Sequence, residues 1–187
     1  MAAHLVCLTF DFDALSNWIR REMTTPTPIS QGEFGVVGTE RILGLLRRHE
    51  IAATWFIPGH TLETYPAICA RIHAAGHEIG HHGYLHEPPA TLSRDREEAV
   101  LLRGSAAIRR ITGSDPRGYR SPSWDLSPHS VELLLAHGHV PPGSHRPRAP
   151  DAGPGPTCQG ADGDGRQVQP NGQRRRRVHR SRSGGLA

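Results

Sequence analysis

Residues 77–86 read His-Glu-Ile-Gly-His-His-Gly-Tyr-Leu-His, and Pro88-Pro89 follows shortly after them. The pattern predicts a short strand over residues 77–80 that ends in a loop carrying His82 and His86 four positions apart. Transition metals are bound by neutral imidazoles that converge on one point. A single histidine is more often a solvated surface residue, so a metal site needs further ligands at the same place.

A second apolar segment, residues 4–10, ends in Thr9-Phe-Asp-Phe-Asp13. Apolar side chains on both faces favour a buried parallel strand, which places Asp11 and Asp13 at its carboxyl end. The two side chains point the same way because they lie two positions apart on an extended chain. An unpaired buried carboxylate is costly, so we predict that at least one of the two aspartates is functional.

The chain up to residue 140 alternates between strand and helix patterns. Further strands are predicted at residues 53–57 and 117–120, and helices at residues 39–50, 66–75, 93–113 and after Ser127-Pro128. The last helix is predicted to point Val131, Leu134 and Leu135 inward, and residues 14–35, with their prolines, are predicted to form a long loop. Repeated alternation favours an α/β fold, a parallel sheet or barrel with its site at the carboxyl ends of the strands.

Composition separates residues 1–140 from residues 141–187. All 22 basic residues are arginine; the first part holds 13 of them against 15 acidic residues, and the second part holds 9 against 3. Cys7, Cys69 and Cys158 are scattered without a paired spacing, which argues for a reducing compartment, and we expect a cytoplasmic protein. No segment resembles a signal peptide or a membrane span, so no membrane partner is expected.

Residues 141–187 contain no aromatic residue, many Gly, Pro and Arg, and few large aliphatic side chains. Such a segment cannot bury enough surface to offset its ordering entropy, so we predict disorder. It is either a basic arm, in which Arg174–Arg177 and Arg180 attract nucleic acid or another polyanion, or coding sequence that is out of frame. The break falls where a fifth strand is due, which favours the second interpretation.

Three motifs occur in order: Thr9-Phe-Asp-Phe-Asp13, His82-Gly-Tyr-Leu-His86 and Arg120-Ser-Pro-Ser-Trp124. They resemble the motifs of the polysaccharide deacetylases of the NodB homology type, carbohydrate esterase family four, and the resemblance runs from about residue 4 to 139. It implies an irregular (β/α)7-type barrel, of which about four β/α units are present, with residues 1–140 as the N-terminal part of the catalytic domain. The separated aspartates and the late aromatic look like the intracellular branch with peptidoglycan-deacetylase-like proteins and allantoinases.

The resemblance also implies roles for individual residues. Asp13, His82 and His86 would bind a divalent metal, most commonly Zn²⁺, with Co²⁺ or Mn²⁺ as alternatives. Asp11 would be the general base and Arg120 would hold it, while Pro122 and Trp124 would line the substrate groove. Taken alone, Arg120 could equally be a surface ion pair and Trp124 a core aromatic. His77 and His81 are interpreted as structural or supporting residues.

We therefore predict a metal-dependent hydrolase of amide C–N bonds, an N-deacetylase of a sugar polymer such as peptidoglycan. The alternatives are a hydrolase of small cyclic amides with the same fold, and a non-enzymatic metal-binding protein whose arginine-rich tail binds a polyanion. A homo-oligomer is compatible with the sequence. The family's second catalytic histidine, the general acid, lies in a Leu-x-x-His motif. Leu134-Leu-Ala-His137 matches these letters but ends the helix directly after the fourth strand, so we expect a coincidence. Without that histidine and the closing strands, we predict a truncated chain that is weakly active or inactive.

Overall fold

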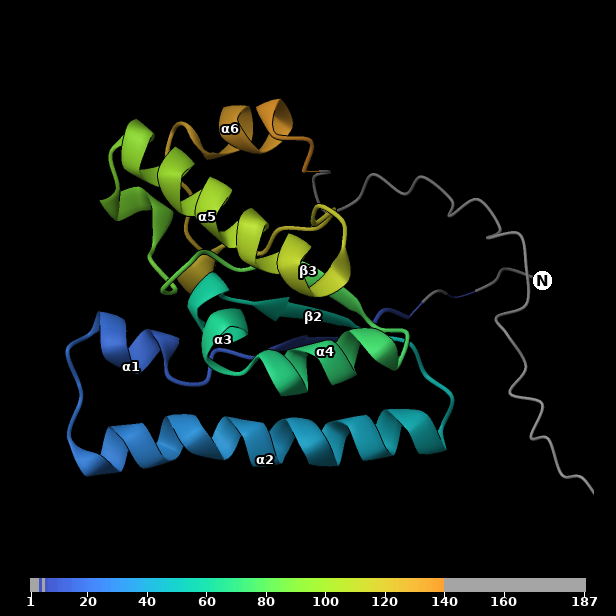
Figure 1. Cartoon of the computed structure of the whole chain (residues 1–187). Coiled ribbons are helices and arrows are strands. Elements are labelled where there is room, and N and C mark those ends of the chain that lie inside the picture. Colours follow the sequence, from blue (N-terminus) through green and yellow to red (C-terminus); the bar gives the residue numbers. More distant parts are fainter. Residues whose placement is uncertain (1–3, 5, 140–187) are drawn as a thin grey trace, which may run out of the picture. The chain divides into compact units, whose positions relative to one another are not determined.

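A computed structural model describes residue 4 and residues 6–139 (Figure 1). Strands β1 (Thr9–Asp11), β2 (Thr54–Ile57) and β3 (Glu78–His81) form a parallel sheet in the order β1-β2-β3. Residues 117–120, predicted to be a fourth strand, form an isolated parallel bridge instead: Tyr119 pairs with His81 of β3, and the amide of His81 donates to the carbonyl of Gly118 at 2.8 Å. The predicted α/β class with parallel strands is confirmed.

The predictions for residues 141–187, namely disorder, a polyanion-binding arm and an out-of-frame origin, lie outside the described residues. The domain boundary at residue 140 stays a prediction. Within the described part of the chain, the structure contains no helix that is both long and apolar enough to cross a membrane.

Helices follow each strand along the chain. They are α1 (Ser16–Arg20), α2 (Pro26–Arg48), α3 (Gly59–Thr64), α4 (Pro66–Ala74), α5 (Arg94–Thr112) and α6 (Ser130–Ala136), with single 3₁₀ turns η1 (Pro89–Thr91) and η2 (Pro122–Trp124). Helix α4 contacts both α2 and α5, so these helices lie beside one another next to the sheet (Figure 1). Helix α5 begins and ends where predicted, since the Ser93 hydroxyl accepts from the amide of Arg96 and Gly113 closes the helix at φ 76°.

The core lies on the face of the sheet that carries Trp55, Ile57 and Ile79, all of which are buried. Because side chains alternate along a strand, Phe56 and Gly80 belong to the opposite face. The register places Asp11 beside Phe56 and Phe56 beside Gly80, so these three positions form one row across the sheet. The two faces therefore separate the apolar core from the residues that the sequence assigns to chemistry.

Residues 14–35 are mainly helical, which contradicts the predicted long loop. Pro26 takes the first position of α2, where its missing amide hydrogen is not needed, and the helix starts well before the predicted residue 39. Gly32 lies inside the helix at a place where Leu15 packs against the backbone. A side chain has no room there, since an added Cβ would lie 2.6 Å from Leu15 Cδ2. Tertiary packing thus overrides the local helix-breaking pattern.

The N-terminal strand is shorter than predicted. Residues 4–8 were expected to be part of a buried strand, but β1 begins at Thr9 and Val6 is 79% exposed. β1 is an edge strand of the described sheet, which leaves Val6 and Leu8 without a second neighbouring strand.

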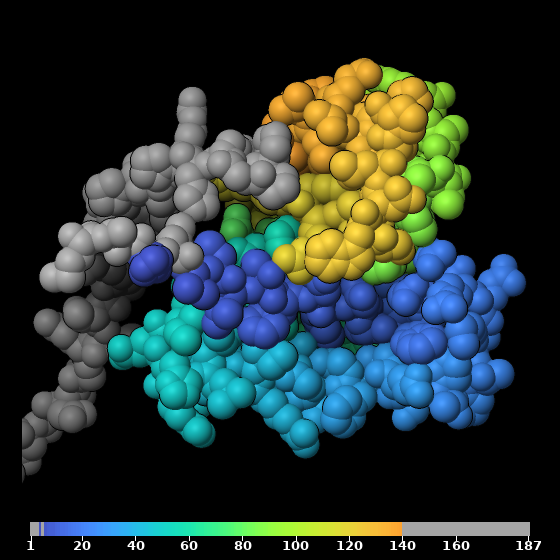
Figure 2. Space-filling view, turned by 180° about the vertical axis from the view of Figure 1, so that it is seen from behind, coloured from blue at the N-terminus to red at the C-terminus, as the bar shows by residue number. Residues whose placement is uncertain are grey.

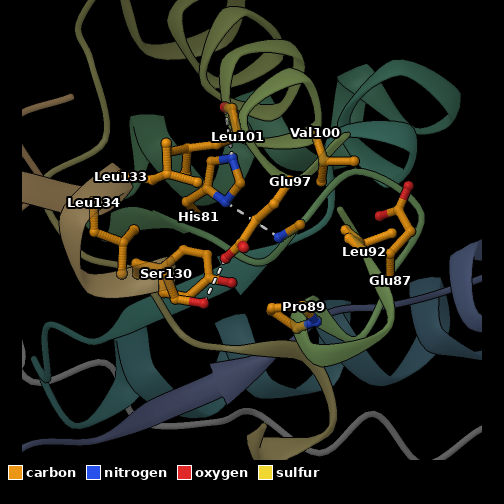
Figure 3. A pocket seen from close by; sticks show the side chains of 12 residues that line it. His81, Glu87, Pro89, Leu92, Glu97, Val100, Leu101, Ser130, Leu133 and Leu134 are labelled. Atoms are coloured by element: carbon orange, nitrogen blue, oxygen red, sulfur yellow. Dashed lines mark hydrogen bonds between the residues drawn. The ribbon is translucent and has the colours of Figure 1, made fainter. Parts of the chain in front are cut away.

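Helix α6 is rotated relative to the prediction. Leu133 is buried, whereas Val131 and Leu135, predicted to point inward, are more than half exposed. The cause is a buried polar contact: the hydroxyls of Ser127 and Ser130 donate to the carboxylate of Glu97 on α5. Figure 3 shows the bond from Ser130. These bonds fix α6 with Ser130 and Leu133 toward α5, beside a cavity of about 10 Å³ that has room for about one water.

Candidate metal centre

Asp13, His82 and His86 converge at the carboxyl ends of β1 and β3. Their potential ligand atoms all lie within 4.8 Å of one another, and among the described residues no other such cluster of three is found. Asp13 follows β1, and both histidines lie in the loop after β3. Parallel strands bring their carboxyl ends to the same edge of the sheet, which is why residues about 70 positions apart in the chain meet here.

The distances fit ligands of one ion better than direct hydrogen bonds. His82 Nε2 lies 3.6 Å from Asp13 Oδ1, and His86 Nε2 lies 3.6 Å from Asp13 Oδ2. Both distances are too long for a hydrogen bond. Ligand atoms bound about 2 Å from a tetrahedral metal lie roughly 3.3 Å from one another, which is close to the observed spacing.

The surroundings of the two imidazoles differ. His82 Nδ1 lies 2.8 Å from the backbone carbonyl of Arg120 and donates to it, which leaves Nε2 with its lone pair toward Asp13. His86 Nδ1 is buried and finds no hydrogen-bond partner in another described residue. Asp13 Oδ1 is likewise buried without a hydrogen-bond partner in the described part of the chain. A cation between these groups would satisfy the carboxylate oxygen.

Burial acts on the ionisation of both groups. It raises the pKa of Asp13, and the neighbouring His82 and His86 oppose this shift. Burial also lowers the pKa of His86, with the Asp13 carboxylate acting in the opposite direction. A neutral imidazole is the form that binds a metal, and the residues present therefore fit a divalent cation.

Asp11 lies beside this cluster and is held by Arg120. One guanidinium nitrogen of Arg120 donates to Asp11 Oδ1 at 2.5 Å, and the other donates to the Thr9 hydroxyl at 2.6 Å. The guanidinium carbon also lies 4.2 Å from the centroid of the Phe56 ring. The predicted pairing of Arg120 with Asp11 is therefore present in the structure, next to the three potential ligands.

Pro122 and Trp124 lie in the 3₁₀ turn η2 that follows Arg120. Pro122 is fully buried and would contact a side chain placed at Gly83, so it supports the histidine loop. Trp124 is 85% exposed at φ 60°, with its ring 5.8 Å from the Arg120 guanidinium carbon. Figure 2 shows the segment that contains η2, coloured yellow, lying against the blue N-terminal segment. Of the two, Trp124 is the side chain available to a ligand.

The remaining histidines of the motif region have structural contacts. His81 is completely buried, accepts from the amide of Gly83 and contacts the carbonyl of Leu101 at 3.0 Å (Figure 3). Its burial lowers its pKa to about 3. His77 accepts from the amide of Ala53. His137 contacts Glu98 of α5 at 2.9 Å and does not belong to the cluster of potential metal ligands.

Several supporting residues were not found from the sequence. Thr9 and Phe56 hold the Arg120 side chain, and Glu87 accepts hydrogen bonds from the amides of Tyr84 and Leu85 in the histidine loop. Thr9 and Phe56 depend on contacts between distant segments, which no local pattern reveals. Glu87 directly follows His86, and its position was the one signal that could have drawn attention to it.

The fold and these side chains define an α/β protein with a candidate metal centre at the ends of its parallel strands. The sequence model of the family described as Polysaccharide deacetylase matches residues 2–141, and the chain belongs to that family. The resemblance predicted from the three motifs is thereby confirmed.

Individual relatives agree with this assignment. A peptidoglycan deacetylase of Helicobacter pylori is 42% identical over 137 residues, 72% of this chain and 47% of that protein. A crystal structure from Mycobacterium smegmatis, of a protein assigned to the polysaccharide deacetylases, is 37% identical with a TM-score of 0.66 over 71% of this chain and 48% of that one. Puue allantoinase, 22% identical with a TM-score of 0.61 over 72% of this chain and 51% of that one, shares the fold. The chain spans about half the length of the relatives it matches.

Proposed function

We propose that this chain carries the metal centre and general base of an N-deacetylase that acts on an N-acetylated sugar polymer, with peptidoglycan as the first candidate. The observation that carries the proposal is the convergence of Asp13, His82 and His86 directly beside the Asp11–Arg120 pair. The Helicobacter pylori relative, named a peptidoglycan deacetylase, supports the substrate class.

An amide carbonyl is a poor electrophile, so its hydrolysis needs a group that polarises it and a base that activates water. A divalent cation bound by Asp13, His82 and His86, most commonly Zn²⁺ in this family, would polarise the carbonyl and acidify a water molecule. Asp11 would take the proton of that water as a general base. Arg120 holds the Asp11 carboxylate through its guanidinium and holds the His82 ring through its backbone carbonyl.

The substrate surface is proposed at the 3₁₀ turn η2. Trp124 presents an exposed ring next to Arg120, and an aromatic face beside polar groups suits the apolar face of a sugar ring. The exposure of this ring favours an extended polymer over a small cyclic amide, which would need an enclosed pocket. The similarity to the allantoinase is one of fold and does not favour the cyclic substrate.

The proposal is tested by metal binding and by acetate release. The metal-free chain is titrated with Co²⁺, followed by its visible absorption, and acetate is measured after incubation with N-acetylglucosamine oligomers and Zn²⁺. Asp13→Asn keeps the side-chain volume but removes a charged ligand, and we expect it to weaken Co²⁺ binding by about 10-fold or more. The matched control is Asp95→Asn, because Asp95 lies in the first turn of α5 and is not one of the three potential ligands.

Equal Co²⁺ affinity in the wild type and Asp13→Asn would contradict the proposed centre. Acetate release that depends on Asp13 would support the deacetylase and would also refute the prediction that this chain is weakly active or inactive. Co²⁺ bound through Asp13 without hydrolysis of any N-acetylated oligomer would leave the binding site in place and refute activity of this chain on its own.

A further inference from the structure

The loop of residues 83–87 carries His86 in a conformation that ordinary side chains rarely adopt. His86 has φ 62° and Gly83 has φ 72°. A non-glycine residue in the left-handed region costs about 1–2 kcal/mol, so it persists only where the surrounding structure imposes it. Something outside His86 itself must therefore hold the loop.

The Glu87 carboxylate lies inside this loop. Its Oε2 atom accepts from the amide of Tyr84 at 3.0 Å and from the amide of Leu85 at 2.7 Å. Hydrogen bonds to an ionised carboxylate are about twice as strong as neutral ones. The carboxylate thereby closes the three residues before Glu87 into a turn around a single oxygen atom.

The other side of the loop is held by the backbone of α3. The amide of Gly59 donates to the carbonyl of Gly83 at 3.1 Å, and the amide of His60 donates to the carbonyl of Tyr84 at 2.9 Å. These contacts fix residues 83 and 84 but do not reach Leu85 or His86. The bond from the Leu85 amide to the Glu87 carboxylate lies directly beside His86 in the chain.

The two imidazoles of the proposed centre differ in how they are oriented. A histidine that binds a metal usually donates its second ring nitrogen to an acceptor, which fixes the ring. His82 does this through the Arg120 carbonyl, whereas His86 Nδ1 finds no such partner in another described residue. The orientation of His86 must then be set through its backbone.

We infer that Glu87 is a positioning residue for His86: its carboxylate fixes the loop so that His86 Nε2 faces Asp13 before a metal binds. The inference rests on the proposed function, because it assumes that His86 is a metal ligand. Glu87 does not belong to the cluster of potential ligands, and its Oε2 atom accepts from the two loop amides instead. Its effect is on metal affinity, through His86 alone.

The test measures Co²⁺ affinity of the full chain by absorption titration. Loss of a residue that supports a metal ligand typically weakens binding about 10- to 100-fold, and this is the result expected for Glu87→Ala. Glu87→Gln keeps an oxygen at the same place and should lose less than about 10-fold, because a neutral acceptor remains. Glu132→Ala is the control, since Glu132 is an exposed glutamate on α6 that pairs with Arg94, and it should leave the affinity unchanged.

A double-mutant cycle separates positioning from general support of the fold. In a His86→Ala background, Glu87→Ala should weaken Co²⁺ binding no further, because the group through which it acts is gone. An equal loss in both backgrounds would assign Glu87 to the fold and overturn the inference. So would a folded Glu87→Ala chain with wild-type affinity, or a Glu87→Gln chain that is folded and as weak as Glu87→Ala.

The His86→Ala and Glu87→Ala variants separate the role of Glu87 from the metal centre itself. Binding of Co²⁺ that does not depend on His86 means that the centre itself is wrong, and the role of Glu87 falls with it. Binding that depends on His86 but does not respond to Glu87→Ala overturns the role of Glu87 and leaves the centre in place.

Discussion

Replacement of Gly80 by alanine should destabilise the fold, because a side chain at this position has no room beside Phe56. Gly80 lies in the row with Phe56 and Asp11 across the strands. A Cβ at this position would lie 2.6 Å from Phe56 Cε1, 2.7 Å from Phe56 Cδ1 and 3.3 Å from the Gly118 carbonyl oxygen. Carbon atoms pack best at about 3.5–4.0 Å, so the ring must move by about 1 Å.

A shift of the Phe56 ring would also disturb the Arg120 guanidinium, because the ring contacts this group and the group in turn holds Asp11. Overpacking of this kind costs about 1–3 kcal/mol, and we expect Gly80→Ala to lower the free energy of unfolding by that amount. Urea unfolding of the metal-free chain, followed by far-UV circular dichroism, measures the change.

Glycines on α2 provide controls with the opposite sign. Nothing lies within 4 Å of a Cβ built at Gly38 or Gly44, and both lie in the interior of the helix. Alanine at either position should therefore stabilise the chain by about 0.5–1 kcal/mol. In a Phe56→Leu background the cost of Gly80→Ala should fall, since the smaller side chain leaves room. A Gly80→Ala chain as stable as the wild type, or a cost of Gly80→Ala that is the same in the Phe56→Leu background, would refute the reasoning.

Two further predictions concern a buried histidine and an exposed aromatic ring. Burial and the neighbouring His139 lower the pKa of His81 to about 3. The unfolded chain therefore binds a proton that the folded chain does not between about pH 6.5 and about 3, so stability is lost as the pH falls through this window, by about 1.4 kcal/mol per pH unit. His81→Gln, which keeps one donor and one acceptor, should remove that contribution from the slope of unfolding free energy against pH; an unchanged slope would contradict it. Trp124→Ala should change stability by less than about 0.5 kcal/mol because the ring is 85% exposed, but it should weaken binding of a chitin oligomer by about 1 kcal/mol, with Trp124→Phe intermediate. Binding measured by NMR titration that is equal in all three chains would remove Trp124 from the substrate surface.

Elements with local start and stop signals were predicted well from the sequence. Ser93 and Gly113 bound α5 because a hydroxyl cap and a left-handed glycine act within a few residues of the chain. The N-terminal half of α2 was not predicted, because prolines and Gly32 were interpreted as helix breakers; Pro26 instead takes the first helical position, and Gly32 packs against Leu15. The rotation of α6 was missed because it depends on Glu97, which lies 30 or more residues away in the chain.

The family resemblance named Asp13, His82 and His86 as ligands, and the sequence alone predicted only that they lie near the ends of parallel strands. Asp13 lies just past the end of one parallel strand, and His82 and His86 just past another, so the fold itself brings them together. The groups that orient them could not be predicted in the same way. His82 is held by a backbone carbonyl, which carries no sequence signature, and Phe56 contacts Arg120 through a register that only the assembled sheet defines.

Arg120 shows why this site cannot be divided into independent motifs. Its backbone carbonyl fixes the tautomer of a proposed metal ligand, and its guanidinium holds the proposed base, so one residue sets the distance between the two halves of the chemistry. Its own position depends in turn on the bridge to β3, where its amide donates to the carbonyl of His81 at 2.9 Å. Because His81 is buried and bonded to α5, the placement of the reactive groups is tied to the packing of the core behind the sheet. Changes at His81 should therefore disturb the site in two ways, through the bridge to Arg120 and through the histidine loop, where the Gly83 amide donates to the His81 ring.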